Sequence, residues 1–270
     1  MKKRAGTLLV GVILLGLAYQ PPKSAREQEF SVKTADGFVL RGKMYYPELL
    51  EGEKFRKVLL LLHQWNKTQE EWENPYGVVS RFRREGFVVV TFDFRGHGKS
   101  TTKGEKRIGV RDLRPGDIAL FPDDAGEVMK YVEATLKGAE KEARILTYVM
   151  GASIGANSAL IYGAREKQVV ALILLSPGKE YHGLGIMQAA KEYAQSGRPA
   201  LWLAARDDEY SANTLQEIQK IIPAKGFRLE IYPSGGHGWA LFGKYPDLTQ
   251  QILNWMKQAT PPIFPKVGTE

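Results

Sequence analysis

The chain has 270 residues, of which 43% are hydrophobic, so it is long enough to bury the core of one large domain. Cysteine is absent, which excludes disulfide bonds, a thiolate nucleophile and cysteine-bound metals. The net charge is +8, but lysine and arginine are interspersed with aspartate and glutamate, without the long basic block or basic-aromatic stripe typical of nucleic-acid-binding proteins. We therefore expect a catalytic domain that uses oxygen and nitrogen groups and has no nucleic-acid partner.

The first residues have the layout of a targeting segment. Three cations precede an apolar run at residues 5–19, and this run is shorter than the roughly 20 residues that a transmembrane helix needs. The small residues Gly16 and Ala18 suit a signal-peptide cleavage site. We expect residues 1–25 to be a signal peptide, with an uncleaved membrane anchor as the alternative. Either would export the protein, to the periplasm, the extracellular space or the outer side of a membrane with which the anchor associates.

The segments after the leader predict an α/β fold. Residues 29–37 and 38–47 flank an Asp36-Gly37 turn, which predicts an antiparallel hairpin at the edge of a sheet. Continuous apolar runs typical of buried strands follow, at residues 57–63, 87–94, 144–151, 169–177, 199–206 and 227–235. Helical patterns lie between them, near residues 70–85, 122–138, 153–165, 184–197, 211–222 and 246–258. This alternation predicts one domain over residues 27–260, a mostly parallel central sheet with helices on both faces, followed by a tail at 261–270.

Two connections bear on the shape of a site. Residues 101–122 form a long connection, and long connections in compact domains are often functional. We expect this connection to narrow the active site along one wall. The segment between Pro177 and Pro199 is too short for a large lid. The sequence therefore predicts an open site.

The main chemical motif follows the strand expected at 144–151. In the pentapeptide GASIG, Ser153 stands two positions from Gly151 and two from Gly155, which is the G-x-S-x-G pattern of a nucleophile elbow. A serine on a sharp strand-to-helix turn needs small neighbours, because strand and helix approach each other closely there. The sequence therefore predicts Ser153 as a nucleophile and the amide of Ile154, at the start of the next helix, as an oxyanion donor.

A serine hydroxyl needs a base, and the base needs a carboxylate that fixes its tautomer. His237 lies in the glycine-rich loop directly after the last expected strand. The acid should follow the strand expected at 199–206, where Asp207 and Asp208 are adjacent. In parallel sheets, functional groups gather at the carboxyl ends of the strands. The order Ser, Asp, His is that of the α/β-hydrolases.

With the motifs "GASIG", "AARDDEYS", "GGHG" and "DFRGHGKS", nearly the whole chain after its leader resembles the α/β-hydrolases. The nearest branch is the uncapped one that contains dienelactone-hydrolase-like and esterase-like proteins. The family's spacing from a small residue to the acid selects Asp208 if Ala205 is that residue, and Asp207 if it is Ala204. We favour Asp208.

The resemblance also implies a second oxyanion donor in the loop after the strand at 57–63. The family often has a histidine-glycine pair there, but in this chain Gln64 replaces the glycine. The donor is then the backbone amide of Trp65 or that of Gln64. His63 itself is expected to be a buried, hydrogen-bonded loop residue.

Other polar residues have structural interpretations. Asp123 and Asp124 stand at an expected helix start, where negative charge is favourable. His97 is expected to make structural hydrogen bonds, and His182 to lie on the surface or at the rim of the site. The sequence has no H-x-x-x-H motif, so we expect no metal site.

The sequence thus predicts a carboxylesterase-like serine hydrolase that forms an acyl-enzyme on Ser153, with Asp208 and His237 completing the triad. Its expected partner is a small-molecule ester or acyl substrate, and the chemistry requires no cofactor. A peptidase, an amidase or an acyltransferase would use the same residues, because the pocket sets the substrate. A non-catalytic, ligand-binding homologue is the alternative from another class, and it is less favoured because all three triad positions are filled.

Overall fold

A computed structural model describes residues 27–47, 55–73, 76–139, 144–222 and 226–259. The leader predicted at 1–25 and the tail predicted at 261–270 lie outside these ranges. None of the helices within the ranges is long and apolar enough to span a bilayer.

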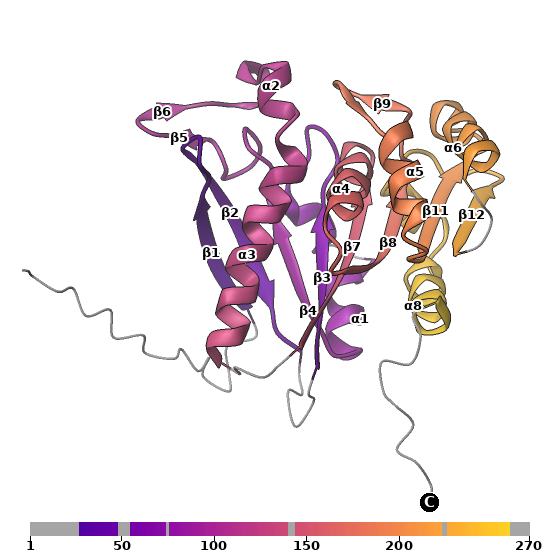
Figure 1. Cartoon of the computed structure of the whole chain (residues 1–270), viewed down its shortest axis with the longest axis horizontal. Coiled ribbons are helices and arrows are strands. Elements are labelled where there is room, and N and C mark those ends of the chain that lie inside the picture. Colours follow the sequence, from indigo (N-terminus) through magenta and orange to yellow (C-terminus); the bar gives the residue numbers. More distant parts are fainter. Residues whose placement is uncertain (1–26, 48–54, 74–75, 140–143, 223–225, 260–270) are drawn as a thin grey trace, which may run out of the picture.

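The central sheet is mostly parallel, as predicted (Figure 1). Its parallel strands lie side by side in the order β12 (Phe227–Tyr232), β11 (Ala200–Ala205), β8 (Val169–Leu175), β7 (Arg144–Ala152), β3 (Phe55–Leu62) and β4 (Phe87–Phe92). These are the apolar runs of the sequence. Because the strands are parallel, all their carboxyl ends reach one edge of the sheet, the upper edge in Figure 1.

The predicted hairpin is present at the other side of β4. Strands β1 (Glu27–Lys33) and β2 (Phe38–Tyr45) pair antiparallel, and β2 pairs antiparallel with β4. Gly42 in β2 lies under the ring of Phe30 of β1, where a Cβ atom would come within 2.3 Å of the ring and 2.5 Å of the carbonyl oxygen of Thr91 in β4. The hairpin strands thus pack closely against each other and against β4.

Helices cover both faces of the sheet because the strand side chains alternate between two apolar layers. In β3, Leu60 and Leu62 belong to one layer, and Leu59 and Leu61 to the other. The first layer packs against α3 (Phe121–Ala139), α4 (Ile154–Arg165), α5 (Met187–Gln195) and α6 (Glu209–Ile221). The second packs against α1 (Val78–Arg84), α7 (Ala240–Lys244) and α8 (Leu248–Ala259).

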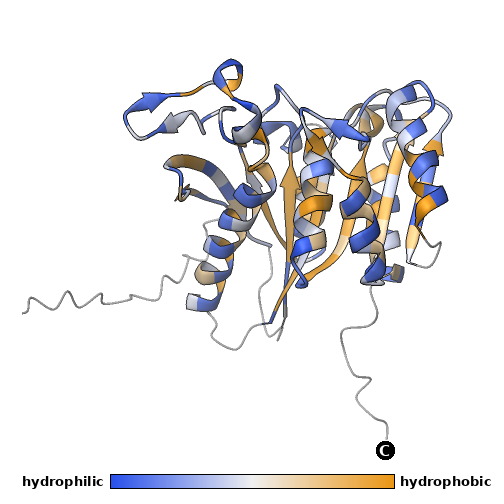
Figure 2. Ribbon diagram, turned by 45° about the horizontal axis from the view of Figure 1, so that its top comes forward, coloured by the Kyte–Doolittle hydropathy of each residue, from blue (hydrophilic) through white to orange (hydrophobic). Residues whose placement is uncertain are grey.

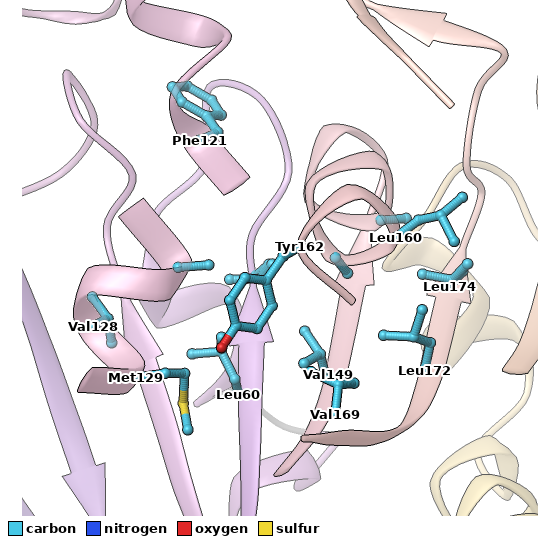
Figure 3. Close-up of a cluster of buried hydrophobic side chains, with 14 of the residues drawn as sticks. Leu60, Phe121, Val128, Met129, Val149, Leu160, Tyr162, Val169, Leu172 and Leu174 are labelled. Carbon is cyan, nitrogen blue, oxygen red and sulfur yellow. The ribbon is translucent and has the colours of Figure 1, made fainter. Parts of the chain in front are cut away.

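The figures show how these layers are built. In Figure 2 the strands are largely hydrophobic, and the covering helices carry hydrophobic and hydrophilic residues on different faces. Figure 3 shows the first layer, where Met129 of α3 and Tyr162 of α4 lie near Leu60 and Val149 of the sheet. The predicted fold class is confirmed.

Two segments differ from the sequence-based expectation. The helix expected at 70–85 is divided into the 3-10 turn η1 (Gln69–Trp72) and α1, which begins only after Gly77 with its left-handed φ of 64°. The long connection after β4 has structure of its own, formed by β5 (Thr102–Lys103), β6 (Lys106–Arg107), η2 (Val110–Asp112) and α2 (Pro115–Ile118).

The two aspartates at the start of α3 have different surroundings. Both lie in its first turn, as expected, and Asp123 is exposed. Asp124, however, is buried and accepts a hydrogen bond of 2.7 Å from Nε of the buried Arg95. Arg95 also contacts Asp36 in the hairpin turn, with 3.0 Å between Nη1 and Oδ2. Asp124 therefore ties α3 to the loop after β4, a role that its position at a helix start does not reveal.

Candidate active site

Ser153 stands on the sharp turn between β7 and α4. Its backbone has a φ of 57° and a ψ of −124°, a strained conformation for a residue with a side chain. A Cβ atom on Gly151 would lie 2.2 Å from the carbonyl oxygen of Gly155, and one on Gly155 would lie 2.3 Å from that of Leu62. The positions two residues before and two residues after the serine therefore both require glycine, as the elbow motif implies.

His237 links Ser153 to an aspartate. Its Nε2 lies 2.8 Å from Oγ of Ser153, and its Nδ1 lies 2.8 Å from Oδ2 of Asp208. The carboxylate of Asp208 has no proton to donate, so it accepts a hydrogen bond from Nδ1, and Nδ1 therefore carries the imidazole proton. Nε2 then presents a lone pair to the hydroxyl of Ser153. This is the arrangement in which an imidazole can act as a base towards a serine.

The adjacent aspartates hold different groups. Asp207 accepts hydrogen bonds from the amides of Gly235 and Gly236, each at 3.0 Å, and these bonds lower the pKa of its carboxyl. Burial would raise the pKa of Asp208, but hydrogen bonds from His237 and two serines outweigh it and hold that pKa below its usual value. Asp208 thus orients the imidazole, and Asp207 holds the backbone of the loop that carries it.

The two serines were not identified from the sequence. Ser176, directly after β8, accepts a hydrogen bond of 2.8 Å from the amide of Gly238, and its side chain also bonds Asp208. Ser211, in α6, is fully buried and also bonds Asp208. The position of Ser176 at the carboxyl end of an apolar run was the available signal.

Two backbone amides are free to bind an oxyanion. Among the described residues, neither Ile154 at the start of α4 nor Trp65 after β3 donates its N–H to another residue. The amide of Gln64, the other candidate, already donates to Oε1 of Glu71 at 2.8 Å. The prediction that allowed Gln64 as the oxyanion donor is therefore wrong for this structure, because its amide already donates to the carboxylate of Glu71.

Gln64 instead connects two loops of the site. Its Nε2 donates to Oε2 of Glu71 at 3.2 Å, and its Oε1 accepts from the amide of Trp239 at 3.3 Å. The same Oε1 lies against Gly238, where a Cβ atom would approach it to 2.0 Å. Burial raises the pKa of Glu71 to about 7. Gln64, at the position where a glycine was expected, therefore links the loop after β3 to the loop of His237.

His63 has a structural environment. It is fully buried, with Nδ1 donating to the carbonyl of Gln64 at 2.7 Å and Nε2 accepting from the amide of Phe94 at 2.9 Å. Burial and the neighbouring His97 lower the pKa of His63 to about 3, so it stays neutral. The prediction of a buried, hydrogen-bonded histidine is confirmed.

A short ribbon, β9 (Glu180–Tyr181) and β10 (Leu184–Gly185), borders the site. At its tip the exposed His182 stacks on Trp65, with 4.0 Å between ring centroids and 25° between ring planes. Tyr181 meets the ring of His237 edge-on at 5.9 Å. Trp65 is also stacked at 6.2 Å on Phe121, which follows α2, so the long connection lies on that side of the site.

The described residues contain no cluster of histidine, aspartate and glutamate arranged to hold a metal ion.

The comparisons with known families and solved structures return hydrolases. Residues 53–184 match the family model described as Serine aminopeptidase, S33. The match includes Ser153 but ends before Asp208 and His237. No curated protein sequence matches significantly.

Many solved structures share the fold. A Pyrococcus furiosus esterase has a TM-score of 0.63 and 18% identity, with 86% of this chain and 90% of that chain covered. Est1E from Butyrivibrio proteoclasticus, solved with ferulic acid bound, has a TM-score of 0.64 and 17% identity, over 85% and 98% of the two chains. A thermostable carboxyl esterase from Bacillus coagulans, in complex with glycerol, has a TM-score of 0.62 and 14% identity, over 86% and 98%.

Proposed function

Since the chain has the α/β-hydrolase fold that it was predicted to have, and its family match and structural relatives support a hydrolase, we propose that it is a serine hydrolase acting on carboxylic esters. The observation that carries the proposal is the line of two 2.8 Å contacts from Ser153 through His237 to Asp208. A nucleophile, a base and an orienting acid in hydrogen-bond reach of one another are the components of acyl transfer through a serine.

The reaction then follows from the positions of the groups. Nε2 of His237 accepts the proton of Ser153 as its Oγ attacks the ester carbonyl. The free amides of Ile154 and Trp65 donate to the oxyanion of the tetrahedral intermediate. His237 returns the proton to the leaving alcohol, and a water, activated by the same imidazole, cleaves the acyl-enzyme. No metal or organic cofactor takes part in these steps.

The ribbon between β8 and α5 is short, which supports small or exposed esters as substrates. The names of structural relatives point the same way, since they are described as esterases, one with ferulic acid bound and one with glycerol. These ligands belong to those proteins. For this chain they suggest which esters to include in a first panel of substrates.

Peptide hydrolysis is the second candidate, because the matched family model describes serine aminopeptidases. It would use the same Ser153, Asp208 and His237, with an amine in place of the alcohol as leaving group. Aminoacyl anilides assayed beside esters of the same acyl groups separate the two candidates.

The test is labelling with a fluorophosphonate probe, with Ser153→Ala and His237→Ala as variants. We expect the wild type to label and both variants to lose labelling, because the probe reacts only with an activated serine. Ester turnover should fall in parallel by a factor of about 10³ or more. Equal labelling or turnover by Ser153→Ala would contradict the proposal. A folded wild type that binds esters without cleaving them would favour the non-catalytic homologue.

We also propose that residues 1–25 export the protein. The three cations and the apolar run at 5–19 support this. Fractionation of the native host should find the protein outside the cytoplasm, shortened if the segment is cleaved and membrane-associated if it is kept. Full-length protein in the cytosol would contradict export.

A further inference from the structure

We propose that Tyr181 is a further catalytic residue, whose hydroxyl donates a hydrogen bond to the leaving alcohol oxygen of the substrate. This inference rests on the proposed serine hydrolase function. Sequence patterns did not identify Tyr181, because the ribbon that carries it has no catalytic motif.

The hydroxyl of Tyr181 lies beside the triad. It is 3.1 Å from Oγ of Ser211, donates to the carbonyl oxygen of Ser176 at 3.4 Å, and also interacts with the hydroxyl of Ser153. The contact of 3.4 Å is long for an O–H donor, so the proton can turn to a closer acceptor. Its ring stands perpendicular to that of His237, at an interplanar angle of 84°. The hydroxyl therefore faces the nucleophile next to the imidazole that transfers the proton.

The topology of the sheet separates this hydroxyl from the oxyanion donors. The strand β7 that carries Ser153 lies between β3 and β8. Trp65 follows β3 and Tyr181 follows β8, so the two start from opposite sides of β7, and only the tip of the ribbon reaches Trp65, through His182. The amides of Trp65 and of Ile154, which follows β7 itself, hold the oxyanion. A donor on the β8 side, beside His237, then faces the oxygen to which His237 delivers its proton.

The ribbon that carries Tyr181 is fixed at its base. The buried Asn157 of α4 donates to the carbonyls of Gly178 and Leu184, at 2.9 Å and 2.8 Å, and accepts from the amide of Gly178 at 3.1 Å. The hydroxyl of Tyr210 bonds both the amide and the carbonyl of Glu180, at 3.1 Å and 2.9 Å. Tyr181 is thus held in place before a substrate binds, which is what a transition-state donor requires.

Tyr181 keeps its own proton throughout. Burial raises the pKa of its hydroxyl to about 12, so it remains a donor at every working pH. The proton of Ser153 moves to His237 and from there to the leaving oxygen as the bond between carbonyl carbon and alcohol oxygen breaks. Tyr181 stabilises the negative charge that develops on that oxygen. Its contribution should therefore grow as the alcohol becomes a poorer leaving group.

The experiment compares Tyr181→Phe with the wild type on esters that share one acyl group and differ in the alcohol, from p-nitrophenol to ethanol. We expect kcat/KM of Tyr181→Phe to fall about tenfold on the ethyl ester and less than about twofold on the p-nitrophenyl ester, in line with the loss of one hydrogen bond. The slope of log kcat/KM against the pKa of the alcohol should become steeper.

Tyr210→Phe is the matched control. It removes a tyrosine hydroxyl of α6 that holds the ribbon and keeps the hydroxyl of Tyr181, so any loss should depend much less on the alcohol than the loss in Tyr181→Phe. A Tyr181→Phe variant whose losses are uniform, or the same as those of Tyr210→Phe, would overturn the proposal. A wild type that does not label with the fluorophosphonate would instead remove the proposed function, and the role of Tyr181 with it. Labelled wild type with an unchanged slope in Tyr181→Phe removes only the role of Tyr181.

Discussion

The two loops that serve Ser153 differ in what they contribute. The loop of His237 contributes a side chain, which is 42% exposed and depends on hydrogen bonds for its aim. The loop after β3 presents the free backbone amide of Trp65, two residues after the fully buried His63. An exposed side chain is oriented by a few hydrogen bonds, whereas a backbone amide is oriented by all the residues that pack around its loop. Substitutions should therefore act differently on the two sides.

The largest expected effect is on the His237 side, from Asp208→Asn. Asparagine can donate to Nδ1 and so favour the wrong tautomer of His237, which should lower kcat by about 10³–10⁴-fold with little change in fold. Ester turnover and near-UV circular dichroism measure the two effects.

Asp207→Asn is the matched comparison. Its carboxylate holds the amides of Gly235 and Gly236 and does not contact the imidazole of His237, and an asparagine oxygen can still accept from one of these amides. We expect a loss of about tenfold or less, since the loop rather than the tautomer is affected. If Asp207→Asn lost as much as Asp208→Asn, the assignment of one aspartate to the imidazole and one to the backbone would be wrong.

A smaller effect is expected where the two loops meet. Gly238 has a φ of 57°, and a Cβ atom there would collide with Oε1 of Gln64. Gly238→Ala should therefore displace the His237 loop and lower kcat/KM by up to about 100-fold. Removing the colliding side chain, in the double variant Gln64→Gly with Gly238→Ala, should restore part of the activity. Additive losses in the double variant would show that the two loops are not coupled through Gln64.

The smallest effect is expected on the oxyanion side and concerns pH. The pKa of Glu71 is raised by burial from 4.5 to about 7, so the folded protein binds a proton that the unfolded chain has lost between these values. The contribution of this proton to the free energy of unfolding is fully present below about pH 4.5 and is lost as the pH rises through about 7. Wild-type Tm should therefore decline over this range relative to that of Glu71→Gln. Parallel Tm curves of the two proteins would contradict this.

The sequence predicted the side-chain half of the site better than the backbone half. Ser153 was identifiable because the elbow needs glycine two residues away on both sides, and His237 because it lies in a glycine-rich loop after the last predicted strand, in the order Ser, Asp, His. Whether an amide is free depends on what folds over it. That Gln64 donates to Glu71, seven residues later, follows from the 3-10 turn η1, where a continuous helix was expected.

The fold was predictable for a related reason. Long apolar runs and the Asp36-Gly37 turn are local signals, and they gave the strands, the hairpin and the parallel arrangement. Tyr181 and Asn157 reach the site through contacts that are remote in sequence, and Asp124 meets Arg95 in the same way. No pattern along the chain encodes such contacts.

The ribbon also identifies a position where new sequence could be added. Its base is clamped by Asn157, whereas Gly183 at its tip is exposed and has open space where a side chain would stand. Loop closure becomes only slowly more costly with length, by about 0.6 kcal/mol for each doubling. A longer segment inserted at Gly183 would therefore extend over the opening of the site while Ser153 and its partners keep their places. The same scaffold could in this way acquire a cap, and with it a narrower choice of substrates.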